Sequence, residues 1–168
     1  MYDLIIKNLD FNSRIKIIEI SKYLGYYILT NKHLWNDIEI YNPRGYKYIL
    51  DFIKNINDNP CRVLCVSSGV IKINLDSYKL DKLEHLNLSN SKISFNNLVK
   101  ILYKYKLKKL YLKRINLYGL VRHIVNSQKD TLEELDLSIS KRHTYQFQSF
   151  SFFYFSKIII DYFKFGIL

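Results

Sequence analysis

Leucines recur at a fixed spacing in the second half of the chain. The six-residue pattern Leu-x-x-Leu-x-Leu begins at Leu83, Leu107 and Leu132, so its starts lie 24 and 25 residues apart. The fourth and sixth residues of each copy point to one face of a short strand, because side chains alternate between the two faces. One copy cannot bury its leucines alone, so copies must stack and share a core. The pattern therefore predicts an α/β solenoid in which short parallel strands alternate with helices.

Weaker copies of the same pattern occur upstream. The six-residue windows that begin at Trp35 and Cys61 fit the template with other apolar residues. Helix starts lie between the copies, at Asn42 with Pro43 and at Ser94, and the second of these helices should run to Lys106. The expected inward residues of the last two helices are Leu98, Ile101, Leu102, Tyr105, Leu120, Val121 and Ile124.

Residues 1–34 do not follow the repeat. Residues 10–13 have the composition of a turn and helix N-cap. The residues that then recur at helical spacing are Ile17, Ile20, Leu24 and Tyr27. Gly25 marks a weak point or the end of this helix. We therefore expect a small helical cap ahead of the first strand.

Residues 144–168 break the pattern and are rich in Phe and Tyr. Three interpretations are open: a strand or helix that caps the stack, a truncated or altered reading frame that leaves it uncapped, or contact with a membrane. A membrane span needs about 20 apolar residues, and Lys157, Asp161 and Lys164 interrupt this segment. We favour the cap.

The net charge of +11 suggests an acidic partner, nucleic acid or a membrane surface. Residues with AT-rich codons dominate the chain, however, and this bias alone raises the lysine content. Cys61 takes a core position of the pattern and Cys65 a position on the sheet face. They fit neither a disulfide framework nor a zinc site, so we expect one buried residue and one free thiol in a reducing compartment. Residues 1–10 lack the apolar core of a secretory signal.

The residues between the leucines form the opposite face of the predicted sheet. Neighbouring parallel strands lie about 4.8 Å apart, so equivalent positions form rows across them. The candidate partner-binding residues are Glu84, His85, Asn87, Lys108, Lys109, Tyr111, Lys113, Arg114, Glu133, Glu134 and Asp136. Tyr111 would be the central anchor. The alternative is a ladder of surface ion pairs that neutralise one another.

No motif of an enzyme occurs in the chain. His33, His85, His123 and His143 lack metal-binding spacing, and no phosphate loop, nucleophile elbow or dinucleotide fingerprint is present. We therefore expect a non-enzymatic protein without catalytic residues, metal or cofactor. The predicted strand with Lys108, Lys109, Lys113 and Arg114 is basic and lies between two acidic neighbours. No aromatic platform accompanies this basic strand, so we do not expect nucleic acid or an anionic membrane as the main partner of the protein.

The segment from Leu9 to Trp35 resembles the latter part of an F-box. Leu9 would end the first helix, Ile15, Ile18 and Tyr23 would lie in the second, and Leu34 with Trp35 would close the motif. The opening Leu-Pro pair is missing, so the first helix would be shortened. The repeat period falls within the roughly 20–29 residues of leucine-rich repeats. The chain thus resembles an F-box/leucine-rich-repeat protein with a truncated or degenerate F-box and about four to five repeats.

This resemblance implies an F-box-like helical segment over 1–34, leucine-rich repeats over 35–143 and a cap or atypical tail over 144–168. It implies a cytoplasmic or nuclear substrate-recognition subunit of a Skp–cullin–F-box ubiquitin ligase, with an unknown target on the sheet. The implied contacts to the Skp-type adaptor are Leu9, Ile15, Ile18, Tyr23, Leu34 and Trp35. An alternative is a stand-alone repeat protein whose degenerate F-box is only a cap. A third is RNA or anionic membrane held by the basic strand.

Overall fold

The computed structural model of the 168-residue chain describes residues 2–40, 54, 59–67, 78–115 and 119–137. The expected helix after Asn42 and the aromatic segment 144–168 lie outside the described residues.

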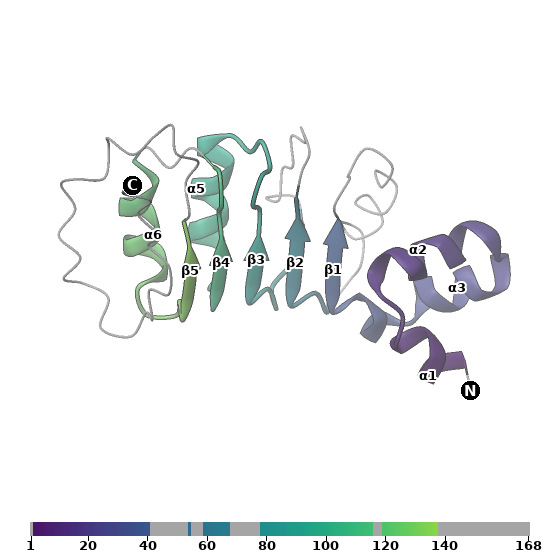
Figure 1. Cartoon of the computed structure of the whole chain (residues 1–168). Helices are drawn as coiled ribbons and strands as arrows, with labels where there is room; N and C mark the ends of the chain where they lie inside the picture. The colour runs from purple at the N-terminus through teal and green to yellow at the C-terminus, as the bar shows by residue number, and fades with distance from the viewer. Residues whose placement is uncertain (1, 41–53, 55–58, 68–77, 116–118, 138–168) are drawn as a thin grey trace.

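The described residues form an α/β structure built on one five-stranded sheet (Figure 1). All four pairs of neighbouring strands are parallel, and the strands follow one another in sequence order. The strands are β1 (Asp37–Ile40), β2 (Val63–Val66), β3 (His85–Asn87), β4 (Lys109–Tyr111) and β5 (Glu134–Asp136). Among the described residues, each strand therefore pairs only with its neighbours in the sequence, which is compatible with a solenoid-like layout.

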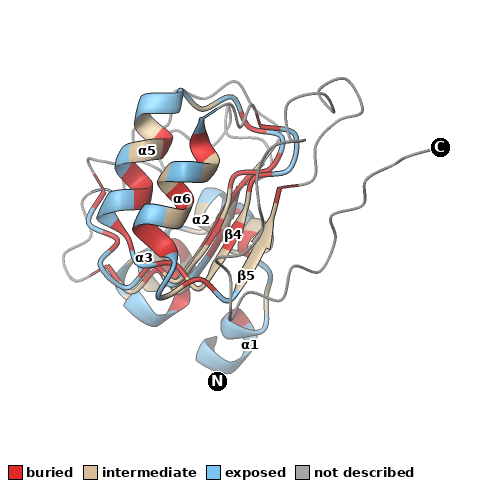
Figure 2. Cartoon of the chain, turned by 90° about the vertical axis from the view of Figure 1, so that its left-hand side faces the viewer, coloured by how far each residue is buried: buried red, intermediate tan, exposed pale blue. Residues whose placement is uncertain are grey.

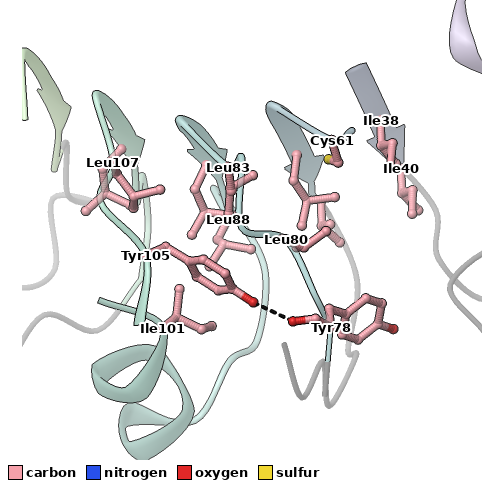
Figure 3. Packing of buried hydrophobic residues seen from close by; sticks show 14 of the residues in the cluster. Ile38, Ile40, Cys61, Tyr78, Leu80, Leu83, Leu88, Ile101, Tyr105 and Leu107 are labelled. Carbon is pink, nitrogen blue, oxygen red and sulfur yellow. Dashed lines mark hydrogen bonds between the residues drawn. The ribbon is translucent and has the colours of Figure 1, made fainter. Parts of the chain in front are cut away.

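The five predicted copies of the six-residue pattern align across the sheet. Their fourth residues pair in one row: Ile38, Leu64, Leu86, Leu110 and Leu135. The first and sixth residues of all five copies are buried, and Figure 3 shows several of them on the side of the strands that faces Ile101. Leu135 in the edge strand is only partly buried. The alignment predicted from the sequence, including its two upstream copies, is confirmed.

Among the described residues, the helices α5 (Phe95–Lys104) and α6 (Leu120–Gln128) lie on the apolar side of the sheet at its β4–β5 end, side by side in Figures 1 and 2. Ser94 is the N-cap of α5, as expected, and its hydroxyl accepts a hydrogen bond from the Asn97 amide. The helix ends at Lys104 rather than at the predicted Lys106. The expected inward residues are buried, apart from Val121, which is partly buried.

A tight turn follows β3 and β4 at the same position of the pattern. The amide of Ser91 donates to the Leu88 carbonyl at 3.0 Å, and that of Ile115 donates to the Leu112 carbonyl at 3.2 Å. Asn90 and Arg114 both adopt a φ of 60° in these turns. Asparagine tolerates this left-handed conformation better than most residues, whereas arginine does so at a cost.

Gln128 connects the last two units through a buried side chain. Its Oε1 atom accepts a hydrogen bond from the Leu107 amide at 2.9 Å. Its Nε2 atom donates to the carbonyls of Leu102 and Tyr105. One amide side chain thus satisfies three backbone groups where helix α5 returns to strand β4, and these groups would otherwise be buried without partners.

Helices α1 (Tyr2–Lys7), α2 (Phe11–Ile20) and α3 (Lys22–Thr30) and the 3₁₀ helix η1 (Lys32–Trp35) precede the sheet. Asp10 caps α2, as expected, by accepting a hydrogen bond from the Ser13 amide. The single helix predicted through Tyr27 is wrong. It is interrupted at Ser21, whose hydroxyl accepts from the Leu24 amide and starts α3.

Gly25 is therefore not a helix end. It lies buried within α3, where a Cβ atom would approach the Ile18 carbonyl oxygen of α2 to 3.1 Å. The missing side chain lets the two helices pack closely. The change of direction at Ser21 also turns Ile20 outward, although the predicted helix placed it on the inner face; its side chain is 82% exposed.

Trp35 joins the N-terminal helices to the sheet. Its indole Nε1 donates to the Ile28 carbonyl at 3.0 Å, and its ring meets Phe11 edge-on with a centroid distance of 6.2 Å. The guanidinium of Arg14 donates to the carbonyls of Leu9 and Leu34. The helices and the strands consequently share one continuous apolar core.

Replacement of Leu86 by alanine tests this shared core. Leu86 is fully buried at the centre of the sheet, and such a change costs about 2–5 kcal/mol because it removes apolar contacts and leaves a cavity. Ile20→Ala is the control, since a change at this exposed site should alter the free energy of unfolding by about 0.5 kcal/mol or less. Urea denaturation followed by circular dichroism measures both. Equal losses would contradict the core position of Leu86.

Candidate partner-binding face

The polar face of the sheet has the rows that the sequence predicted. The register pairs His85 with Lys109 and Lys109 with Glu134. One step further along the strands it pairs Asn87, Tyr111 and Asp136 in the same way. The candidate residues of β3, β4 and β5 are therefore brought together on one surface, opposite the face covered by α5 and α6.

Sequence analysis placed Cys65 on this face but missed the other residues that the first two strands contribute. Asp37 and Glu39 of β1 and Cys65 of β2 continue the rows, and Arg62 lies immediately before β2. The upstream copies of the pattern already predicted these strands, so the same alternation could have identified their outward residues.

Glu84 sits between two cations from neighbouring units. Its Oε2 atom lies 2.7 Å from Arg62 Nη2, and its Oε1 atom lies 3.3 Å from Lys108 Nζ. Hydrogen bonds from Arg62 and then Lys108 lower the pKa of the Glu84 carboxyl. The predicted alternation of acidic and basic strands thus appears as paired charges.

Glu134 has the same role on the other side of the basic strand. Its Oε2 atom lies 2.8 Å from Lys109 Nζ, and this hydrogen bond, followed by one from Tyr111, lowers its pKa. Burial and the hydrogen bond to Glu134 raise the pKa of Tyr111. Tyr111 is half-buried, and its hydroxyl is held by the hydrogen bond to Glu134. It therefore presents a fixed hydroxyl group to a partner and not a protruding ring.

The remaining candidates differ in exposure. Lys113 and Arg114, in the turn after β4, and Glu133 are exposed, whereas His85 and Asn87 are half-buried. The Asn87 Oδ1 atom accepts a hydrogen bond from the Ser89 amide and so supports the turn. The exposed cations among the predicted residues therefore lie at the carboxyl end of β4, beyond the paired part of the face.

Both thiols are shielded from water. Cys61 is buried in the core, as expected, and burial raises its pKa to about 12. Cys65 lies on the polar face, as predicted, but it is also buried, and burial raises its pKa. A thiolate is the reactive form, so neither residue has the environment of a nucleophile. Within the described residues, no group of three or more His, Cys, Asp or Glu side chains could hold a metal ion.

The six residues expected to contact an adaptor have different environments. Ile15, Leu34 and Trp35 are buried in the core, and Ile18 is partly buried against it. Leu9 is half-buried, while Tyr23 is 71% exposed. The other exposed apolar residues of these helices are Leu4, Ile5, Ile20 and Tyr26. Sequence analysis did not identify them as surface residues, because their positions depend on the break at Ser21 and on how α1 packs.

Replacement of Glu134 by glutamine tests the paired charges. The folded-state pKa of this group is lowered from 4.5, so its stabilisation is present above that pH and is lost as the pH falls through the folded-state pKa. Glu134→Gln should lower Tm at pH 7, and the difference should disappear at low pH. Glu133→Gln, at the exposed preceding residue, is the control and should change Tm less. A Tm difference that does not vary with pH would contradict the ion pair.

No helix in the described part of the chain has both the length and the apolar character needed to cross a bilayer. Comparison with known proteins gave no matching family model, no matching curated protein and no matching solved structure.

Proposed function

We propose that this chain is a non-enzymatic protein-binding subunit of the F-box/leucine-rich-repeat type, which presents a target protein to a Skp–cullin–F-box ubiquitin ligase in the cytoplasm or nucleus. The observation that carries the proposal is the in-register stacking of five copies of one apolar pattern. Stacked repeats of this kind offer an extended sheet surface for a partner.

The sheet face supports recognition of a protein more than catalysis. Its charges are arranged in pairs around Glu84 and Glu134, and its thiols are shielded. A partner with complementary charges would gain orientation and specificity from such a surface. The receptor itself carries out no reaction. It raises the concentration of the target near the conjugating enzyme, because two binding sites are linked in one molecule.

The N-terminal helices supply a candidate surface for the adaptor. Tyr23 and Tyr26 are both 71% exposed and lie three residues apart on α3, so they share one side of the helix. Ile20 precedes them at the end of α2 and is exposed as well. Exposed apolar side chains that gather in this way are typical of protein interfaces.

The second candidate is a stand-alone repeat protein in which these helices are only a cap. Trp35, Leu34 and Ile15 favour it, because their burial seals the β1 end of the core instead of forming a docking surface. Both candidates use the sheet face to bind a protein, and they differ only in adaptor binding.

A pull-down with a purified Skp-type adaptor distinguishes them. The ligase proposal expects a stoichiometric complex that the double change Tyr23→Ala/Tyr26→Ala weakens about tenfold or more, since an aromatic anchor contributes about 2 kcal/mol. Tyr103→Ala, at an exposed tyrosine of α5, is the control and should leave the complex unchanged. Failure of the folded wild-type chain to bind the adaptor would reject the ligase role and support the cap.

A further inference from the structure

The turn that follows β4 carries two cations at the end of the polar face. Lys113 and Arg114 are exposed, and neither side chain forms an ion pair or a hydrogen bond with the described residues. The preceding lysines of the same unit differ, because Lys108 and Lys109 each lie against a glutamate of a neighbouring unit. Within the described part of the chain, the positive charge of this turn is therefore available to a partner.

The chain brings few carboxylates near this turn. Residues 87–129 contain no Asp or Glu, and Asp161 is the only acidic residue after Asp136 in the sequence. Asp136 pairs with Tyr111 in the register, so it lies two positions before Lys113 along the strands, or roughly 7 Å. The acidic residues of the β5 unit therefore lie toward the middle of the face, whereas the cations lie at its end.

The backbone of the turn is fixed against the preceding unit. The Lys113 amide donates to the Ser89 hydroxyl at 3.2 Å, and the Lys113 carbonyl accepts from the Asn90 amide at 2.8 Å. Ser89 is itself buried. A partner would thus meet cations on a backbone that is already in place, which reduces the entropy lost on binding.

The turn does not need an arginine for its shape. Asn90 is the equivalent residue after β3 and has the same φ of 60° as Arg114. Asparagine adopts this left-handed conformation at little cost, whereas arginine adopts it at some cost in stability. Among the described residues no side-chain contact of Arg114 offsets that cost. Residues that break a local rule in this way are typical of functional positions.

Carboxylates of a protein suit this turn better than a nucleic acid does. A guanidinium binds a carboxylate through two parallel hydrogen bonds, and a lysine adds a point charge beside it. A long phosphate backbone across the face would approach the carboxylates of Glu133 and Asp136 and be repelled by them. Among the described residues of this face, the ring of Tyr111 is half-buried and offers no platform for stacked bases.

We propose that the target protein binds through a short acidic segment, a run of Asp or Glu residues whose carboxylates pair with Lys113 and Arg114. The site lies beyond the arrowhead of β4 in Figure 1, at the carboxyl end of the strand. This inference rests on the proposed use of the sheet face for protein recognition, and it names the chemistry of the partner.

Fluorescence anisotropy of the full chain with a labelled peptide of four consecutive glutamates between glycine–serine flanks tests the proposal. The double change Lys113→Ser/Arg114→Asn gives the turn the residues of the preceding unit, Ser89 and Asn90. It should weaken peptide binding about tenfold or more, because it removes both charged contacts. Urea denaturation should show no loss of stability in this variant, since asparagine suits the turn. Added salt should weaken binding of the peptide to the wild type.

A matched variant excludes general electrostatic attraction. Lys16→Gln/Lys22→Gln removes two exposed cations from α2 and α3, so it has the same net charge as the test variant and should bind the peptide as the wild type does. A peptide with glutamine in place of glutamate should not bind. Absence of binding by the glutamate peptide, equal weakening in both variants, or tighter binding of a 12-nucleotide oligothymidylate would overturn the proposal.

The adaptor pull-down separates this inference from the proposed function. Lys113 and Arg114 lie on β4 and not on the N-terminal helices, so the test variant should bind a Skp-type adaptor as the wild type does. A chain that binds the adaptor but not the glutamate peptide would overturn only the acidic segment. A chain that binds the peptide but not the adaptor would overturn only the ligase role.

Discussion

No strand of this sheet can hide its own apolar side chains, because each is only three or four residues long. Burial of one leucine or isoleucine contributes about 1.5–3 kcal/mol, but only a neighbouring copy provides that burial. Leu86 and Leu110 are fully buried because they have strands on both sides, whereas Leu135 at the edge is only partly buried. The structure is thus held together by contacts between successive copies.

The same constraint explains the role of the N-terminal helices. The first copy has no preceding strand among the described residues, and Trp35 occupies its first apolar position. A tryptophan can pack both on the sheet and on Phe11 and Ile28 of the helices, as its ring contact and hydrogen bond show. The side chain that closes the helical segment is therefore also part of the repeat core, and the two regions fold as one body.

The sequence allowed the sheet to be predicted well, since a pattern with period two and five equivalent starts leaves little freedom in register. It was less informative for the helices before the sheet. A continuous helical spacing through Tyr27 concealed the break at Ser21, because a serine can cap a new helix by a local hydrogen bond that the apolar pattern does not reveal. Gly25 was misinterpreted for a related reason, as its role depends on the backbone of another helix.

Side-chain pairing was the least predictable feature. The rows on the polar face followed from the register, but whether Lys108 and Lys109 are available to a partner depends on where their amino groups lie. They lie against Glu84 and Glu134. The aromatic contact between Phe95, Tyr103 and His123 joins residues of two helices, and no spacing within either helix indicates it.

The net charge of +11 is therefore a poor guide until it is divided between surfaces. On the sheet, cations and carboxylates alternate from strand to strand, so a partner meets a patterned surface with little net charge in its paired part. The exposed cations Lys113 and Arg114 follow β4, beyond the paired part of this face. A patterned surface favours one partner over others, because a partner has to match both signs of charge along the rows.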